Sequence, residues 1–187
     1  MPSRSPITYV ALLRGINVGG SNVIPMSALV KTFERMGLDS VKTYIASGNV
    51  LFRTPGGEPR AIEARIERAL SKAHAYDARV VLRSHAEMAR HVKDLPRAWK
   101  RPDPKMRYNV LFLRHEVDSE SILEGLAPKP DIEQISYRPG VLFWSAHTSD
   151  LARTSMVKLS SRPIYKHVTV RNLNTTRKIL ELMDAMV

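Results

Sequence analysis

The chain has 187 residues, of which 43% are hydrophobic and 25% are charged, and these are the proportions of a globular rather than a disordered protein. It has no cysteine, which excludes disulfides, thiolate nucleophiles and cysteine-ligated zinc and is typical of the reducing cytoplasm. No apolar run is long enough to cross a bilayer, and residues 1–7 lack the pattern of a signal peptide. We therefore expect a cytoplasmic protein without a membrane partner.

The formal net charge of +11 is the most unusual feature of the composition. Such a surface attracts anions, among them nucleic acid and phosphorylated metabolites. A basic bias without a specific partner is the alternative, because net charge alone does not define a binding site.

The first half, expected over residues 1–96, shows alternating strand and helix patterns. Pro25 and Gly37 bracket a helical pattern as start and stop signals, and Ser84 and Glu87 have the spacing of a capping box. We predict strands at 9–13, 41–45, 50–52 and 79–83, and helices at 26–36, 60–75 and 84–95.

Residues 97–107 contain two prolines and are interpreted as an irregular, basic linker. The second half, expected over 108–187, repeats the pattern of the first. We predict strands at 109–113, 132–137, 141–144 and 168–170, helices at 121–126 and at the C-terminus, and a poorly patterned segment at 150–161.

Each half therefore reads strand, helix, strand, strand, helix, strand, helix. The segments Val10–Arg14 and Val110–Arg114 are similar in sequence, and both halves place an apolar strand just after a tight turn. The predicted fold is α+β, a tandem pair of ferredoxin-like (split βαβ) units, each followed by an extra helix. In such a unit the first two strands run parallel, so the loop after Arg14 and the hairpin at residues 47–49 should lie at the same end of the sheet.

The glycine-rich loop after Arg14 is the principal candidate site. Glycines let backbone N–H groups approach an anion, an arginine can bind a phosphate or carboxylate through two bonds, and asparagines can orient a polar ligand. The alternative is a pair of tight turns, with Arg14 in a surface ion pair. The predicted anion-binding residues are Arg14, Gly15, Asn17, Gly19, Gly20, Ser47, Gly48 and Asn49.

Two basic segments are candidates for a phosphate backbone. Residues 151–180 contain seven Lys and Arg and no acid, and around Trp99 an aromatic is interleaved with cations, as in single-strand binders. The alternatives are a solvated basic face and a Trp99 tucked between the two halves. The predicted basic surface consists of Arg153, Lys158, Arg162, Lys166, Arg171, Arg177 and Lys178.

The segments Leu12–Gly20 and Tyr44–Asn49 resemble the family catalogued as domain of unknown function 1697, which comprises uncharacterised, mostly bacterial proteins. The segment Arg171–Thr175 extends the resemblance, although the family usually has a tryptophan at the position of Leu173. Leu151–Leu159 is only a partial match to a segment that the family tends to carry. The resemblance implies a tandem ferredoxin-like architecture and no established activity, substrate or cofactor.

Three functions stay open at this point. The leading hypothesis is a protein that binds nucleic acid, a nucleotide or another small anion. The second is an enzyme acting on a small phosphorylated or carboxylated substrate, and the third is a structural or partner-binding protein. The six histidines show no metal-ligand spacing, so we expect neither metal nor cofactor.

Overall fold

The computed structural model describes residues 5–17 and 22–187 and divides into two compact units, Met1–Ala89 with Ile179–Val187 and Arg90–Lys178. Each unit contains one four-stranded antiparallel sheet, and the chain is α+β. The predicted linker differs from the structure, because residues 97–107 fall inside the second unit. They contain a 3-10 turn at Arg97–Lys100 and the start of a strand at Met106.

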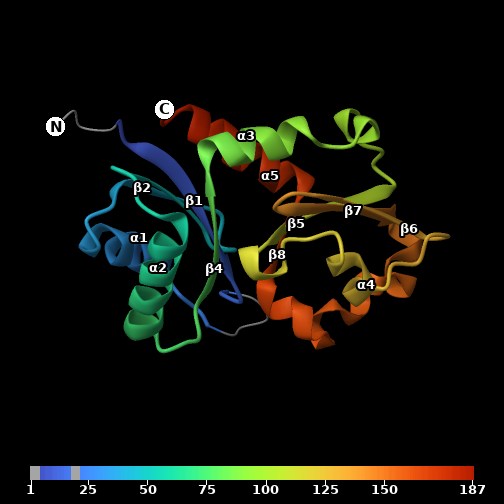
Figure 1. Cartoon of the computed structure of the whole chain (residues 1–187), viewed down its shortest axis with the longest axis horizontal. Helices are drawn as coiled ribbons and strands as arrows, with labels where there is room; N and C mark the ends of the chain where they lie inside the picture. Colours follow the sequence, from blue (N-terminus) through green and yellow to red (C-terminus); the bar gives the residue numbers. More distant parts are fainter. Residues whose placement is uncertain (1–4, 18–21) are drawn as a thin grey trace. The chain divides into compact units, whose positions relative to one another are not determined.

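The first unit has the sheet order β2-β3-β1-β4, so the central strand β1 lies between β3 and β4 and is antiparallel to both (Figure 1). Alternate residues of β1 contribute to the core together with α1 and α2, which lie side by side. The elements are β1 Ile7–Arg14, α1 Met26–Arg35, β2 Asp39–Tyr44, β3 Asn49–Thr54, α2 Pro59–His74, β4 Arg79–Ser84 and α3 His85–Lys93, whose last residues from Arg90 on belong to the second unit.

The helix ends follow local signals in the sequence. Pro25 directly precedes α1, and Gly37 after it has a φ of +72°, the left-handed conformation that glycine favours at this position. The capping box before α3 is present, since Glu87 accepts from the Ser84 N–H at 2.8 Å and the Glu87 N–H donates to Ser84 Oγ at 3.3 Å. The stop signal at Gly37 and the capping box are confirmed, whereas Pro25 is the N-cap residue rather than the first helical residue.

The outer edge of β4 is closed by side chains of α2. Glu63, Glu67 and Ser71 are four residues apart and so lie on one face of α2. The bonds run from Ala78 N to Ser71 Oγ (3.1 Å), from Val80 N to Glu67 Oε1 (2.9 Å) and from Leu82 N to Glu63 Oε2 (3.2 Å). Edge N–H groups that would otherwise be open to another strand are thereby satisfied.

The second unit has the equivalent sheet order β6-β7-β5-β8, again with an antiparallel central strand. Its crossover from β7 to β8 differs from the prediction, since three 3-10 turns take the place of a helix; the poorly patterned sequence at 150–161 lies in the first two. The elements are β5 Met106–Leu113, α4 Ile122–Leu126, β6 Glu133–Arg138, β7 Val141–His147, the 3-10 turns Thr148–Arg153, Ser155–Ser161 and Pro163–His167, β8 Val168–Asn172 and α5 Leu173–Asp184, whose residues from Ile179 on belong to the first unit.

A buried carboxylate ties these turns to the sheet. Glu133 is 3% exposed and accepts from Trp144 Nε1 at 2.6 Å and from the Ser155 N–H and hydroxyl, each at 3.0 Å. Burial alone would raise the pKa of Glu133, but these bonds and one from the Lys129 N–H outweigh it, so the pKa lies below its usual value.

None of the described helices is both long and apolar enough to cross a membrane.

Candidate functional site

Residues 15–17, the described start of the glycine-rich loop, lie beside the β2–β3 hairpin, as the predicted topology requires. Leu12 of β1 is opposite Asn49 of β3, and the Leu13 N–H donates to the Gly48 carbonyl at 2.8 Å. We call the described residues of this end of the sheet, 14–17 and 45–49, the motif corner. Gly19 and Gly20, which were predicted as part of the site, lie outside the described residues.

Asn17 fastens the loop to the hairpin. Its Nδ2 donates to the Ala46 carbonyl at 2.9 Å and to the Ile24 carbonyl at 3.1 Å, while its Oδ1 accepts from the Ile24 N–H at 2.7 Å. Its backbone lies at a φ of +52°, which asparagine tolerates better than most residues. In this arrangement the amide of Asn17 is committed to the chain itself.

Gly48 and Asn49 have equally structural surroundings. A Cβ on Gly48 would lie 2.8 Å from the Leu13 Cβ and 2.9 Å from the Ile16 Cδ1, and its φ of +77° favours glycine. Asn49 is fully buried, and its Nδ2 donates to the Tyr44 carbonyl at 2.9 Å and to Ser47 Oγ at 3.3 Å. The hairpin is thus held against β1 by close packing and internal bonds.

Arg14 and Gly15 are at the outer side of the motif corner. Arg14 is half-buried at the end of β1, opposite Arg79 of β4. Gly15 is exposed at a φ of +71°, and its carbonyl accepts from Asn22 Nδ2 at 2.8 Å. That Arg14 and Ser47 contact an anion stays a prediction.

A hollow of about 440 Å³ adjoins the motif corner, and its lining is mainly apolar. Val23, which lines the hollow, and Ile45, which precedes the lining residue Ala46 in the chain, are large hydrophobic residues that are 72% and 47% exposed. Ile45 also has a φ of +50°, which is unusual for a β-branched residue. The residues that line the hollow are Asn17, Val23, Ile24, Pro25, Met26 and Ala46.

The predicted basic surface is corrected at Arg171. This side chain is in β8, is only 8% exposed, and donates to the Val170 carbonyl at 2.8 Å. Burial lowers the pKa of Arg171 to about 10, so the side chain is still a cation at neutral pH. Sequence reasoning missed the burial of Arg171 because the residue type does not show which face of a strand, or which depth in the fold, a cationic side chain occupies.

The other six cations have different environments. Arg153, Lys158 and Lys166 are exposed, whereas Arg162, Arg177 and Lys178 are half-buried. Arg153 pairs with Asp150 at 3.2 Å, Arg162 donates to the Gly125 carbonyl, and Arg177 donates to the Trp99 carbonyl at 2.7 Å. These contacts commit part of the predicted basic surface to the fold of the second unit.

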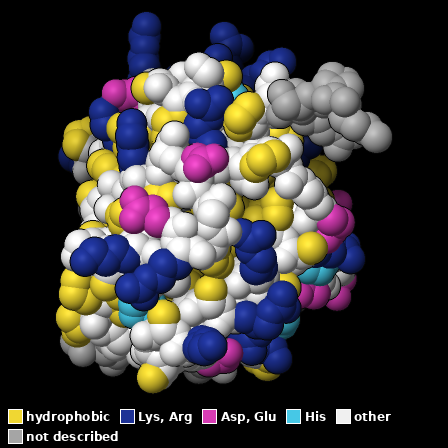
Figure 2. All heavy atoms as spheres, turned by 90° about the vertical axis from the view of Figure 1, so that its left-hand side faces the viewer, with side chains coloured by type: hydrophobic (Ala, Val, Ile, Leu, Met, Phe, Trp, Pro, Cys, Tyr) yellow, Lys and Arg dark blue, Asp and Glu magenta, His cyan; other side chains and the backbone are white. Residues whose placement is uncertain are grey.

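Basic side chains are dispersed elsewhere on the surface as well. Figure 2 shows Lys and Arg side chains distributed over one face of the molecule, with hydrophobic and acidic side chains between them.

Trp99 is 3% exposed and its ring contacts Tyr108 and Phe143, at centroid distances of 5.1 Å and 5.7 Å. Trp99 therefore lies in the core of the second unit and presents no open face to a base.

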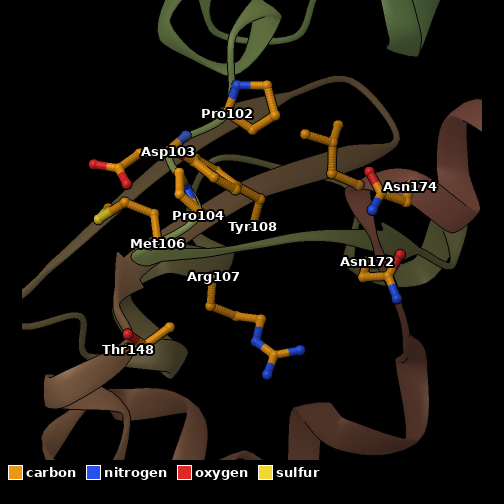
Figure 3. A pocket seen from close by; sticks show the side chains of 10 residues that line it. Pro102, Asp103, Pro104, Met106, Arg107, Tyr108, Thr148, Asn172 and Asn174 are labelled. Atoms are coloured by element: carbon orange, nitrogen blue, oxygen red, sulfur yellow. The ribbon is translucent and has the colours of Figure 1, made fainter.

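A pocket of about 450 Å³ lies in the second unit where β8 ends and α5 begins (Figure 3). Strand β5 pairs with β7 from Met106 onward but with β8 only from Asn109 onward, so the start of β5 lines the gap. We call this gap the Arg107 pocket. Its lining consists of Pro102, Asp103, Pro104, Met106, Arg107, Tyr108, Thr148, Asn172, Leu173 and Asn174.

The polar groups of the Arg107 pocket come from both of its sides. The Arg107 side chain is exposed, and its guanidinium forms no hydrogen bond or ion pair with any residue in the described ranges. Figure 3 shows Asn172 and Asn174 across the pocket from the 102–108 segment. Asn172 Oδ1 accepts from the Thr175 N–H at 2.7 Å and so caps α5, which leaves its Nδ2 as a donor.

The 102–105 loop of this pocket is braced internally. The Asp103 N–H donates to the Tyr108 hydroxyl at 3.0 Å, and Asp103 Oδ1 accepts from the Lys105 N–H at 2.8 Å. In Figure 3 the Asp103 carboxylate points away from the Arg107 guanidinium. The pocket therefore presents a cation whose charge is not neutralised by its acidic neighbour.

Within residues 5–17 and 22–187, no group of three or more His, Asp and Glu side chains could hold a metal ion. The polar side chains at the Arg107 pocket carry amide, hydroxyl, guanidinium and carboxylate groups, the last from Asp103.

The family model described as "Protein of unknown function (DUF1697)" matches residues 7–143. The chain belongs to this family. A solved structure of the conserved bacterial protein SP0830 from Streptococcus pneumoniae is similar, at 26% identity and a TM-score of 0.84, over 96% of this chain and 99% of that one. No curated protein matches the chain. The DUF1697 match includes the motif corner and Arg107, while Asn172 and Asn174 lie beyond it.

Proposed function

We propose that this DUF1697 protein binds a small anionic ligand, such as a nucleotide or another phosphorylated metabolite, in the Arg107 pocket. One observation carries the proposal: an arginine without a partner among the described residues lines a pocket opposite two asparagine side chains. A guanidinium can bind phosphate or carboxylate through two parallel bonds, and these charge-assisted bonds are about twice as strong as neutral ones.

The rest of the pocket suits a ligand of this class. Its volume of about 450 Å³ is in the range of small-molecule sites. The N-terminus of the 12-residue helix α5 adds backbone N–H groups and a positive helix end. Pro102, Pro104 and Leu173 supply apolar surface for a nonpolar part of the ligand.

In this proposal the motif corner is a scaffold rather than the principal site. Asn17, Gly48 and Asn49 are occupied with bonds and packing that hold the loop to the hairpin. Arg14 and Ser47 are proposed as a secondary anion contact.

The order β2-β3-β1-β4, repeated as β6-β7-β5-β8, supports the further proposal that both units are ferredoxin-like and that the protein works in the cytoplasm as a tandem duplication.

Isothermal titration with inorganic phosphate and with nucleoside monophosphates tests the proposal. The variant Arg107→Ala removes the proposed contact, and Arg60→Ala, which removes an exposed arginine at the start of α2, is its matched control. Because bonds to a charged group contribute about 1.5–3 kcal/mol, Arg107→Ala should weaken binding by about tenfold or more. Equal affinity of both variants would refute the assignment to this pocket.

Nucleic acid is the larger anion that the charge of +11 could attract. Anisotropy of labelled oligonucleotides at about 50 and about 200 mM salt measures this, because phosphate contacts make affinity fall steeply with salt. The small-ligand proposal predicts that Arg107→Ala affects nucleotide binding much more than oligonucleotide binding. The reverse order would favour an extended nucleic-acid surface.

A further inference from the structure

Strand β6 forms one border of the second sheet, and its outer side has hydrogen-bonding groups to offer (Figure 1). The Leu113 N–H donates to the Gly140 carbonyl, so alternate residues from Gly140 onward bond to β5. The intervening residues of β7 bond to β6, and their partners there are Gln134, Ser136 and Arg138. The N–H and C=O groups of Ile135 and Tyr137 therefore point away from the sheet.

One of these four outward groups is already engaged, because the Tyr137 carbonyl accepts from Nη1 of the exposed Arg138 at 2.7 Å. A carbonyl oxygen has two lone pairs and can accept a second bond. Within residues 5–17 and 22–187, nothing bonds to the Tyr137 N–H or to the N–H and C=O of Ile135. The strand is also regular, with six successive residues paired to β7 in one register. Such an edge is a template for another strand.

The other unit treats its edges differently. The edge of β4 is closed by Glu63, Glu67 and Ser71. The edge strand β2 is interrupted by a register shift between Asp39 and Lys42. Both devices are ways in which proteins prevent edge pairing. Strand β6 has no register shift, and no described side chain caps the outward N–H of Ile135 or Tyr137.

We propose that β6 pairs with β6 of a second copy of this chain, antiparallel and around a two-fold axis at Ser136. In this register Ile135 of each copy is opposite Tyr137 of the other, and the two pairs exchange four backbone hydrogen bonds. Ile135 and Tyr137 both pack against the core of the second unit, so the pairing extends that core across the axis. Gln134 lies opposite Arg138, and no like charges meet.

The neighbouring registers are excluded by groups on the strand itself. A two-fold axis at Ile135 would require the Glu133 N–H, which already donates to the Lys129 carbonyl at 3.0 Å. An axis at Tyr137 would require an N–H from Pro139, which has none. The self-complementarity of the Ser136 register is the reason for choosing a second copy as the occupant rather than a peptide from another protein.

Sedimentation velocity on the full chain tests this proposal. The contact is smaller than a standard interface of about 1,200–2,000 Å², so we expect a reversible dimer whose fraction rises between about 5 and about 500 µM. Ser136 is half-buried on the face of β6 opposite the core, so a charge there leaves the monomer folded. Thermal melting by circular dichroism checks that condition.

Charge pairs at the axis make the test specific. Ser136→Lys and Ser136→Glu each place like charges directly opposite one another, which should weaken self-association by about fivefold or more. An equimolar mixture of the two variants places opposite charges there and should dimerise at least as well as the wild type. The proposal is overturned by a wild type that stays monomeric, by variants that dimerise unchanged, or by a mixture that stays monomeric.

Discussion

Gly48→Ala is the substitution whose effect the structure defines most closely. The new Cβ would lie 2.8 Å from the Leu13 Cβ and 2.9 Å from the Ile16 Cδ1, both of which are buried. The contact with a Cβ cannot be relieved by a rotamer change, so the hairpin must move away from β1. Overpacking of this kind costs about 1–3 kcal/mol, and a φ of +77° costs an alanine about 1–2 kcal/mol more.

We therefore expect Gly48→Ala to lower the free energy of unfolding by about 2–5 kcal/mol. Gly15→Ala is the matched control, because Gly15 has a similar φ of +71° but a Cβ there meets nothing within 4 Å. Its loss should be limited to the backbone term of about 1–2 kcal/mol. Urea unfolding followed by circular dichroism measures both variants, and equal losses would refute the packing argument.

Three further changes test the internal bonds. Asn17→Ala removes three hydrogen bonds that hold the loop, so urea unfolding should show a loss of about 2–4 kcal/mol. Glu133 has a lowered pKa, so its stabilisation is complete above its unfolded pKa and is lost as pH falls through the folded pKa. Unfolding measured between about pH 3 and pH 6 should show this loss in the wild type but not in Glu133→Gln. Glu67→Ala uncaps the Val80 N–H, so hydrogen exchange at that amide should accelerate while a matched Glu58→Gln variant leaves it unchanged.

Periodicity and turn residues predicted much of the architecture. Helix α2, the capping box at Ser84 and the turn at Pro139–Gly140 follow from local patterns, which depend on neighbours within a few residues. The crossover between β7 and β8 was harder to predict, because one of its 3-10 turns is held through Ser155 by Glu133, which lies 22 residues earlier in the chain.

The candidate site was less predictable for the same reason. Asparagine is a residue type that can contact a polar ligand, so the sequence indicated Asn17 as a site residue. Only the positions of Ala46 and Ile24 in the fold show that the Asn17 amide bonds to the chain itself. The Arg107 pocket depends on where β8 stops relative to β5, and no local pattern at Arg107 or Asn174 contains that information. The segment Arg171–Thr175 was the signal that could have indicated it.

The proposed ligand site is tested most directly by a heteronuclear NMR titration of the isotope-labelled chain with inorganic phosphate and a nucleoside monophosphate. We predict chemical-shift changes confined to residues 102–108 and 172–174 in the wild type and lost in Arg107→Ala. Changes centred on residues 14–17 and 45–49, or no saturable change, would contradict the assignment of the ligand to the Arg107 pocket.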